Sequence, residues 1–303
     1  VLANSQSLHH MLPPDWPHRV YQRQISWRVG ALRVFLQHGV HLNPHAFKRG
    51  NSGYDVFLTS AAGESAALRC ASGDDRQIAE VGLPRFDRLT PTGPSRTILF
   101  MPTWRRYLPS ELRGDQGRGI MPLEGSGYER FITSVLTSRT LASLLDRYDY
   151  TLVFIPHYNV ARFFTGTHGA SDRITVIPPH GDAVPRMIST CDVLITDHSS
   201  VHFDAAYLRT PIVYAQFDNE EYEHLHGAPS WFDFRRDGFG PVTYDLEQML
   251  AALEQVMRGG ARMEQHYADR VRRILTHHDT AHCERTYAAI TDAYARSRGI
   301  AAP

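Results

Sequence analysis

The sequence of residues 191–215, CDVLITDHSSVHFDAAYLRTPIVYA, decides the fold. It begins with a short apolar run at 192–196, whose β-branched residues are typical of a strand that is buried on both faces. After a polar turn, residues 201–208 are predicted to form a helix that ends before Pro211. Residues 212–214 form the next apolar run. Strand, helix and strand in this order make one βαβ unit, so the sequence predicts a parallel α/β sheet.

The polar turn between the first strand and the helix is placed to bind an anion. It follows the carboxyl end of a strand, where open α/β sheets bind their ligands, and the helix start offers N–H groups and a positive dipole end. Asp197, Ser199 and Ser200 are therefore candidate binding residues for a nucleotide diphosphate. Asp204, one helical turn after Ser200, is placed to accept hydrogen bonds from ribose hydroxyls. The alternative is an ordinary helix cap with no ligand.

Other strands of the second half also end in residues that can bind phosphate. The predicted strands 97–101 and 150–155 bring their carboxyl ends to the same edge of the sheet as the turn. The polar residues that follow them are Thr103, Arg105, Arg106 and His157. Arg105 can bind phosphate through two N–H groups, and His157 can donate a hydrogen bond to a phosphoryl oxygen or protonate it. As alternatives, Arg105 pairs with a surface carboxylate and His157 is a satisfied core histidine.

In the first half of the chain, one histidine is a candidate catalytic residue. Residues 31–37, ALRVFLQ, form a predicted strand that ends at His38. An imidazole at the carboxyl end of a parallel strand is placed for acid–base chemistry, although a histidine packed at a strand end is the alternative. His41 and His45 follow, but Pro44 disfavours a helix that would put the three rings on one face, and no metal site is predicted.

The composition is that of a globular protein without a preference for polyanions. The chain has 303 residues, enough for two domains, of which 42% are hydrophobic and 21% are charged. The formal net charge is zero and no basic face with interleaved aromatic residues is visible, so we expect no nucleic-acid partner. The three cysteines are far apart and in no paired motif, which favours a reducing cytosol over a disulfide framework.

The sequence shows neither a secretion signal nor an apolar run that could cross a bilayer. Arginines alternate with apolar residues between positions 19 and 28, a pattern of either a basic amphipathic helix at a membrane surface or a solvated helix face over a core. A first residue other than methionine indicates a fragment or a processed chain. We expect a cytoplasmic protein, and peripheral contact with the inner face of the cell membrane stays open.

The domain organisation is predicted from one linker. Residues 90–95, TPTGPS, contain two prolines and a glycine and separate the two halves. We expect a partial first domain at 1–94, a second domain at 95–278, and a C-terminal helix at 279–303 that packs back on the first domain.

Three further predictions concern the second domain. Residues 107–127 are expected to form a mobile or binding loop, since they are polar, rich in glycine and longer than most connections. Residues 128–148 are expected to form one amphipathic helix, and residues 219–240 are expected to be irregular.

With these residues in view, the chain resembles the CDP-glycerol glycerophosphotransferases, the teichoic-acid polymerase family with a GT-B type catalytic domain. The matching segments occur in the family's order and span most of the chain from about Arg33. They are QHG at 37–39, GLPRFDRL at 82–89, MPTWR at 101–105, Pro-His at 156–157, DVLITDHSSVHFDAAYLRTPIVY at 192–214, GPVTYDLEQM at 240–249 and HDTAHCERTYAAI at 278–290. The segment at 192–214 is the most specific of them.

The resemblance implies a GT-B fold, in which two Rossmann-like domains with parallel sheets face a cleft, here with a short N-terminal domain. It places the family's catalytic histidine on His38 and its second histidine on His157, where the usual His-Pro order is reversed. The family's donor-site motifs fall on Arg105, Asp197, Ser199, Ser200 and Asp204. His198 stands where members often have Tyr. The continuation HGVHLNPH replaces the family's HGT-P-K, so no acceptor contacts are carried over.

The implied function is transfer of a polyol phosphate, with glycerol phosphate expected first, from a CDP-polyol to an acceptor hydroxyl in cell-wall or capsule polymer synthesis, with release of CMP. His38 would take the proton of the attacking hydroxyl. Arg105, His157 and the N–H groups at Ser199 and Ser200 would hold the pyrophosphate. The implied acceptor is lipid-linked or ends in a polyol phosphate. No cofactor is required, and Mg²⁺ stays open because no acidic pair demands it.

Two other functions stay open. A GT-B glycosyltransferase that uses a nucleotide sugar would share the sheet edge and the helix start, but it would form a glycosidic bond and release UDP. A non-catalytic nucleotide-binding module would bind without turnover, and the short first half is compatible with it.

Overall fold

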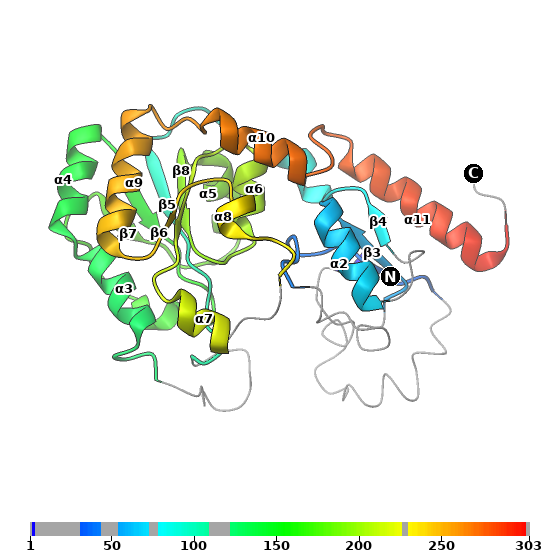
Figure 1. Ribbon diagram of the computed structural model, residues 1–303, viewed down its shortest axis with the longest axis horizontal. Coiled ribbons are helices and arrows are strands. Elements are labelled where there is room, and N and C mark those ends of the chain that lie inside the picture. The colour runs from blue at the N-terminus through cyan, green and yellow to red at the C-terminus, as the bar shows by residue number, and fades with distance from the viewer. Residues whose placement is uncertain are drawn as a thin grey trace. The chain divides into compact units, whose positions relative to one another are not determined.

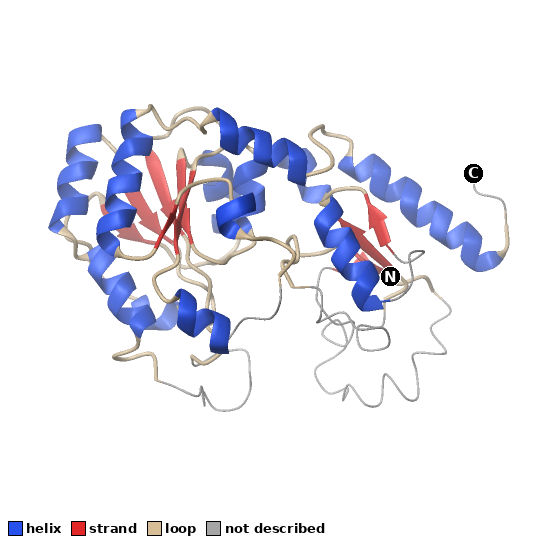
Figure 2. Ribbon diagram, viewed as in Figure 1, coloured by secondary structure: helices blue, strands red, loops and turns tan. Residues whose placement is uncertain are grey.

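The computed structural model describes residues 2–3, 31–43, 54–72, 78–108, 122–225 and 230–300. By its contacts the chain divides into two compact units, each built on a parallel sheet (Figure 1; Figure 2). The first unit comprises Val1–Leu89, Pro229–Phe232 and Arg272–Pro303, and the second comprises Thr90–Ala228 and Asp233–Val271. The predicted fold class, α/β with two parallel sheets, is confirmed. The domain boundaries at residues 94–95 and 278–279 stay a prediction.

The sheet of the first unit is small. Within the described residues its parallel strands are, in spatial order, β1 (Leu2–Ala3), β2 (Val34–Phe35), β3 (Val56–Thr59) and β4 (Ile78–Glu80). The predicted strand 31–37 is wrong in length, because only two of its residues pair and Gln37 has a φ of +64° that turns the chain out of the sheet. His38 therefore follows a turn and not the last residue of a long strand.

Helices complete the first unit. They are α2 (Ala62–Ser72), the 3₁₀ helix η6 (Pro84–Arg88) and the C-terminal helix α11 (His282–Arg298). Helix α11 packs against η6 and β3, and its Ala293 joins a buried cluster with Val34, Val56 and Leu58. The first unit thus combines the first and the last part of the chain.

The segment GLPRFDRL at 82–89 fastens α11 to this unit. The carboxylate of Asp87 accepts hydrogen bonds from the backbone N–H groups of His282 (2.9 Å) and Cys283 (2.7 Å), so it caps a helix that begins 195 residues later. Gly82 has a φ of +82°, and a Cβ there would lie 1.9 Å from Nδ1 of His282, so no larger residue fits. Gly82 and Asp87 of this segment thus have a structural role.

We expect Asp87→Ala to lower the free energy of unfolding by about 1–2 kcal/mol, the usual loss for a helix cap. Partial burial raises the pKa of the Asp87 carboxyl, but the two N–H bonds outweigh it and hold that pKa below its ordinary value. A depressed pKa stabilises the fold above the unfolded-state pKa, and this contribution is lost as the pH falls through the folded-state pKa. Urea denaturation between pH 3 and 7 measures the effect. Asp292→Ala, at an exposed position of α11, is the control, and an equal loss there would refute the assignment.

The larger sheet belongs to the second unit. Within the described residues it has six parallel strands, in the order β10 (Val242–Thr243), β9 (Ile212–Ala215), β8 (Val193–Thr196), β5 (Thr97–Phe100), β6 (Thr151–Phe154) and β7 (Ile174–Val176). The central strands are buried, as the apolar runs predict. The order reverses between β5 and β8. That point, where neighbouring connections leave in opposite directions, is where open α/β sheets bind ligands at the carboxyl ends of their strands.

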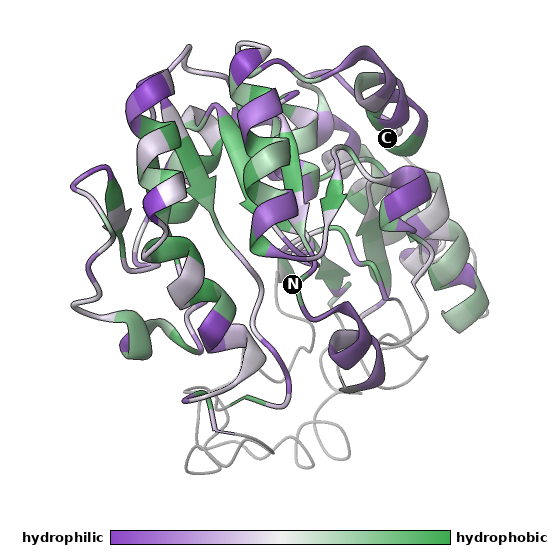
Figure 3. Cartoon of the chain, turned by 60° about the vertical axis from the view of Figure 1, so that its left-hand side comes forward, coloured by the Kyte–Doolittle hydropathy of each residue, from purple (hydrophilic) through white to green (hydrophobic). Residues whose placement is uncertain are grey.

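Helices cover both faces of this sheet. Helices α3 (Gly127–Leu136), α4 (Arg139–Tyr148) and α9 (Leu246–Arg258) pack together on one face, and α5 (Ala183–Thr190) and α6 (Val201–Tyr207) pack together on the other (Figure 1). Figure 3 shows that the strands between them are hydrophobic, whereas the helices carry hydrophilic residues on their outer sides. The core therefore lies between sheet and helices, and the carboxyl edge of the sheet stays available for polar residues.

Two predictions about local structure in this unit are wrong. Residues 128–148 form two helices, α3 and α4, because the side chain of Ser138 accepts a hydrogen bond from Leu141 N (3.1 Å) and starts a new helix. Residues 219–240 are not irregular throughout, since they contain α7 (Asn219–Leu225) and α8 (Phe234–Asp237). Both are too short to show a helical period in the sequence. Helix α10 (Gln265–Ile274) follows α9.

Several predictions fall on residues that the structure does not describe. They concern the amphipathic pattern before residue 28, His45, and the stretch 109–121 of the predicted loop. Among the described helices, none combines the length and the apolar character that a bilayer span needs.

Candidate functional site

The carboxyl ends of β5 and β8 meet at the point where the strand order reverses. Thr103, three residues beyond β5, donates its backbone N–H to Oδ1 of Asp197, the residue directly after β8 (2.8 Å). Thr196 adds a hydrogen bond from its hydroxyl to the carbonyl of Met101 (2.7 Å). The two strand ends that the sequence predicts to be adjacent are thus joined by their own backbone and side chains.

Arg105 lies at the centre of this junction and is fully buried, with 0% of its surface exposed. Its Nε and Nη2 atoms donate to the two carboxylate oxygens of Asp218, at 2.6 and 2.7 Å. Its Nη1 donates to the carbonyl of Thr103 (2.8 Å) and lies 2.7 Å from Oδ2 of Asp197, an ion pair without good hydrogen-bond alignment. One guanidinium therefore connects the ends of β5, β8 and β9.

Aromatic rings and opposite charges keep this guanidinium in place. Its carbon lies 5.0 to 5.3 Å from the ring centroids of Tyr128, Phe217 and Tyr222. Burial disfavours the charged form, but Asp197 and Asp218 hold the pKa of the Arg105 guanidinium well above its ordinary value. Donors on all three nitrogens of Arg105 serve buried groups of the fold, and its direct contact with phosphate stays a prediction. The alternative of a carboxylate pair is what the structure shows, although that pair is buried and not on the surface.

The turn after Asp197 has the open donors that the sequence predicts. Ser200 precedes α6 without a cap bond from its side chain, and Ser199 Oγ accepts only a long bond from Val201 N (3.4 Å). Both serines are half-buried, and among the described residues their backbone N–H groups have no acceptor. Two N–H groups are thus without an acceptor in this part of the structure, and ligand binding by the two serines stays a prediction.

His198 anchors the inner side of the same turn. Its ring is buried and stacks on Tyr222, with the centroids 3.6 Å apart and the planes at 4°. The edge of Phe234 meets it at 5.5 Å, and Gln216 Nε2 lies 3.4 Å from its Nδ1. A planar aromatic ring at this position thus fixes the turn by packing.

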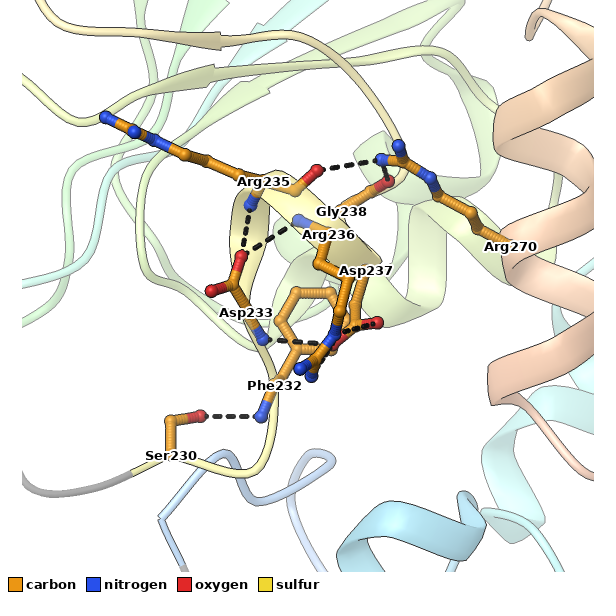
Figure 4. A network of polar contacts seen from close by, with 8 residues as sticks. All are labelled: Ser230, Phe232, Asp233, Arg235, Arg236, Asp237, Gly238 and Arg270. Atoms are coloured by element: carbon orange, nitrogen blue, oxygen red, sulfur yellow. Dashed lines mark hydrogen bonds and ion pairs between the residues drawn. The ribbon is translucent and has the colours of Figure 1, made fainter.

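Helix α8 presents Phe234 to His198. The Asp233 carboxylate caps the helix by accepting the N–H groups of Arg235 (2.9 Å) and Arg236 (2.8 Å), as Figure 4 shows. At the other end, Arg270 from α10 donates to the carbonyls of Arg235 (3.3 Å) and Gly238 (2.9 Å) (Figure 4). Side chains therefore hold both ends of this one-turn helix. They keep Phe234 in contact with the ring of His198.

Asp204 is only 3% exposed, within α6. The residues around it are also buried, and His202 of the same helix lies 2.7 Å from the hydroxyl of Tyr214 through Nδ1. Burial lowers the pKa of His202 to about 3, so this ring is neutral. Contact of Asp204 with a ribose stays a prediction, and it requires access to a carboxylate that the fold nearly covers.

His157 follows β6 and is half-buried beside Trp104, with centroids 6.2 Å apart and planes at 21°. Burial lowers the pKa of His157 to about 4, so its ring is neutral at physiological pH. Its Nδ1 accepts the backbone N–H of Asn159 (3.3 Å), which leaves the proton on Nε2. A neutral ring with its proton on Nε2 can donate a hydrogen bond, and the role of His157 toward a phosphoryl oxygen stays a prediction.

His38, in the first unit, has an exposed ring. It meets the ring of His41 edge-on, with centroids 5.0 Å apart and planes at 87°. Burial, and secondly the neighbouring His38, lower the pKa of His41 to about 3. The role of His38 as a proton acceptor stays a prediction.

The two remaining candidates of the second unit are Arg106 and Thr103. The Arg106 side chain is exposed, next to the buried network, and Thr103 is half-buried. An open cavity of about 830 Å³ adjoins the network, and Phe131, Gln216 and Asp218 are among its lining residues. Within the described residues, no group of three or more His, Cys, Asp and Glu side chains is arranged to hold a metal ion.

Sequence reasoning missed the partners of Arg105. Asp218 comes shortly after the predicted strand 212–214, so the rule that selected Asp197 would also have selected Asp218. Tyr107, which donates to Asp218 (3.1 Å), and Tyr222 carry no comparable signal, because their roles depend on packing between distant segments.

Two parallel-sheet units, one with polar residues gathered where its strand order reverses, define an α/β protein of the GT-B type. The chain belongs to the CDP-glycerol:poly(glycerophosphate) glycerophosphotransferase family, whose model matches residues 34–292. The resemblance seen in the sequence motifs is thereby confirmed.

Two similar proteins have names that refer to teichoic acid. The chain is 25% identical over 267 residues to the minor teichoic acid biosynthesis protein GgaB of Bacillus subtilis (strain 168), covering 86% of this chain and 29% of the relative. It is 30% identical over 227 residues to the teichoic acid poly(glycerol phosphate) polymerase of the same organism, covering 69% and 28%. The chain thus spans less than a third of the length of these two relatives.

Solved structures confirm the fold. The wall teichoic acid polymerase TagF superposes with a TM-score of 0.58 at 17% identity, over 88% of this chain and 68% of that one. The S. aureus MnaA–UDP co-structure superposes with a TM-score of 0.50 at 13% identity, over 89% and 69%. At these identities the likeness is one of fold.

Proposed function

We propose that this chain transfers a polyol phosphate, glycerol phosphate in the first place, from a CDP-polyol to an acceptor hydroxyl. The acceptor oxygen forms a bond to the β-phosphorus, the bond from that phosphorus to the bridging oxygen breaks, and CMP leaves with the electron pair. The observation that carries the proposal is the pair of open N–H groups at Ser199 and Ser200, at the switch point of a sheet in a glycerophosphotransferase family chain.

In this proposal, N–H groups and the guanidinium of Arg106 bind the CDP-polyol. The N–H groups of Ser199 and Ser200 and the Nε2–H of His157 bind pyrophosphate oxygens, and the exposed guanidinium of Arg106 adds positive charge. Thr103 offers its hydroxyl, and Asp204 orients the ribose. Such a site stabilises the charge that develops as CMP departs, which is the main requirement of phosphoryl transfer.

Arg105 and Asp197 act through other groups in this proposal. Their ion pair of 2.7 Å and the hydrogen bond of 2.8 Å between Asp197 and Thr103 N hold the two strand ends together. The Ser199–Ser200 turn begins two residues after Asp197, so its place depends on that pair. Arg105 is therefore proposed as a positioning residue.

The proton of the attacking hydroxyl goes to His38. Its exposed imidazole, next to a His41 ring that stays neutral, supports this role. The acceptor is proposed to end in a polyol phosphate, free or lipid-linked, at the inner face of a bacterial membrane. This transfer step uses only groups of the chain. A contribution of Mg²⁺ stays open.

Purified protein mixed with CDP-glycerol and a poly(glycerol phosphate) primer tests the proposal. We expect release of CMP together with a new phosphodiester, and parallel reactions with EDTA and with Mg²⁺ measure any metal dependence. A glycosidic product with release of UDP from a nucleotide sugar would instead establish the glycosyltransferase. Binding of CDP-glycerol without turnover, for each of several primers, would establish a non-catalytic module.

A hydrogen-bond donor role for His157 gives a specific expectation. We expect His157→Ala to lower kcat/KM on the order of a hundredfold, as for other donors that stabilise transition-state charge. His157→Gln should keep much of the activity, because its amide nitrogen can take the place of Nε2. Since the ring is neutral above about pH 4, the wild-type and Gln enzymes should share one pH profile between pH 5.5 and 8. Equal losses in both variants would argue against a donor role.

A further inference from the structure

The turn that carries His38 has little support from the sheet. Strand β2 ends at Phe35, and Gln37 has a φ of +64° that directs the chain away from the ladder. An exposed imidazole on such a turn is held in one position only if other groups fasten the backbone on both sides of it.

Glu64 provides this fastening from a different element. It lies in the first turn of α2 and is fully buried, with 0% of its surface exposed. Its Oε1 accepts the backbone N–H of His41 (2.7 Å), and its Oε2 accepts that of Ser60, at the end of β3 (2.9 Å). One carboxylate thus ties the His38 turn to the neighbouring strand through both of its oxygens.

Other contacts close the same turn. The Gln37 side chain donates to the carbonyl of Leu58, and Trp231 Nε1 donates to the carbonyl of His41 (2.7 Å). The His41 ring, on which the His38 ring rests edge-on, also packs 5.6 Å from Phe35. Glu64 accepts the N–H of His41, and Trp231 donates to the carbonyl of His41. Both backbone polar groups of His41, whose ring contacts that of His38, are therefore held by side chains.

The burial of Glu64 has an electrostatic cost. Burial raises the pKa of its carboxyl to about 7, although the hydrogen bonds from His41, Ser60 and Gln37 oppose that shift. The charged group that faces it from β4, Glu80, raises it further. A carboxyl kept in so unfavourable a position is a common sign of a functional role.

We propose that Glu64 is a positioning residue that holds His38 in the place where it accepts the proton of the attacking hydroxyl. This inference rests on the proposed function, in which His38 is the base. Glu64 touches neither donor nor acceptor in this proposal. It acts by fixing the peptide of His41, and a displacement of about 1 Å of a reacting group is enough to reduce a rate on the order of a hundredfold.

The variant Glu64→Gln tests the proposal. Its side chain has the same size, but only one oxygen accepts, so the second N–H group would face an NH₂ donor. We expect kcat to fall about 10- to 100-fold while the KM for CDP-glycerol is unchanged. Glu80→Gln is the matched control, since Glu80 accepts hydroxyls of Ser65 and Thr276 and makes no bond to the His38 turn. Equal kinetics in the two variants would overturn the proposal.

Amide hydrogen exchange gives a readout that does not need activity. We expect faster exchange at His41 and Ser60 in Glu64→Gln than in the wild type, with unchanged exchange in the larger sheet. If the wild type proves inactive while these amides respond, the proposed function fails and the fastening role stands. If the amides do not respond, the fastening role fails whatever the activity. Should Glu64→Gln not fold, Glu64→Asp, which shortens the side chain and keeps the charge, is measured in the same two ways.

Discussion

Arg105→Ala is expected to lower the free energy of unfolding of the second unit by about 3–5 kcal/mol, the usual loss when one partner of a buried ion pair is removed. The alanine would leave Asp197 and Asp218 buried without their cation, and three bonds to the ends of β5 and β9 would vanish. Thermal and urea denaturation, followed by circular dichroism, measure the loss.

Two matched substitutions sharpen this prediction. Arg105→Lys keeps the charge but cannot bind Asp218 through two nitrogens, so it should be intermediate in stability. Arg106→Ala, at the exposed neighbouring position, should leave stability unchanged within about 0.5 kcal/mol. An Arg105→Ala protein with wild-type stability and lost affinity for CDP would contradict the positioning role and would restore Arg105 as a phosphate ligand.

His38→Ala is expected to reduce the rate of transfer on the order of a hundredfold or more, because no general base remains for the acceptor hydroxyl. The affinity for CDP-glycerol should not change, since the proposed donor contacts belong to the second unit. Stability should also be unaffected, because the imidazole is exposed. Rapid-quench measurement of CMP release and calorimetric titration with CDP-glycerol separate the two effects.

His266→Ala, at an exposed position on α10, controls for the loss of a surface imidazole. A His38→Ala protein with unchanged turnover would remove His38 from the mechanism and, with it, the reason for the Glu64 proposal. Weaker donor binding with unchanged turnover would assign His38 to the donor site instead.

The parts of the fold that the sequence predicts well are those with a strong local signal. The stretch 191–215 contains β8, α6 and β9 as expected, because short β-branched runs and a proline leave few alternatives. The break between α3 and α4 was missed because the apolar period continues across it, although Ser138 was a visible cap signal. Helices α7 and α8 were missed because one or two turns show no period.

The candidate site was predictable as a location but not as a set of contacts. Polar residues that follow the carboxyl ends of parallel strands are expected to meet at one edge of the sheet. This expectation selects Arg105 and Asp197, which the structure brings together. Whether such a residue faces solvent or another side chain depends on segments far away in the chain. Asp218 is separated from Arg105 by 113 residues, and the sequence offers no means to pair them. The local pattern therefore identifies the edge of the sheet but not the contacts that its side chains make within the fold.

The cap that Asp87 places on α11 bears on how the polypeptide folds during synthesis. The first unit is discontinuous, because Arg272–Pro303 belongs to it together with Val1–Leu89. Most of the residues between them form the second unit, which a ribosome completes while α11 is still unmade. The buried cluster that Ala293 of α11 forms with Val34 and Val56 can therefore be completed only after α11 has been synthesised. We expect β2 and β3 to be more open to aggregation and proteolysis until that point, because of the order of synthesis and not because of the strength of their final contacts.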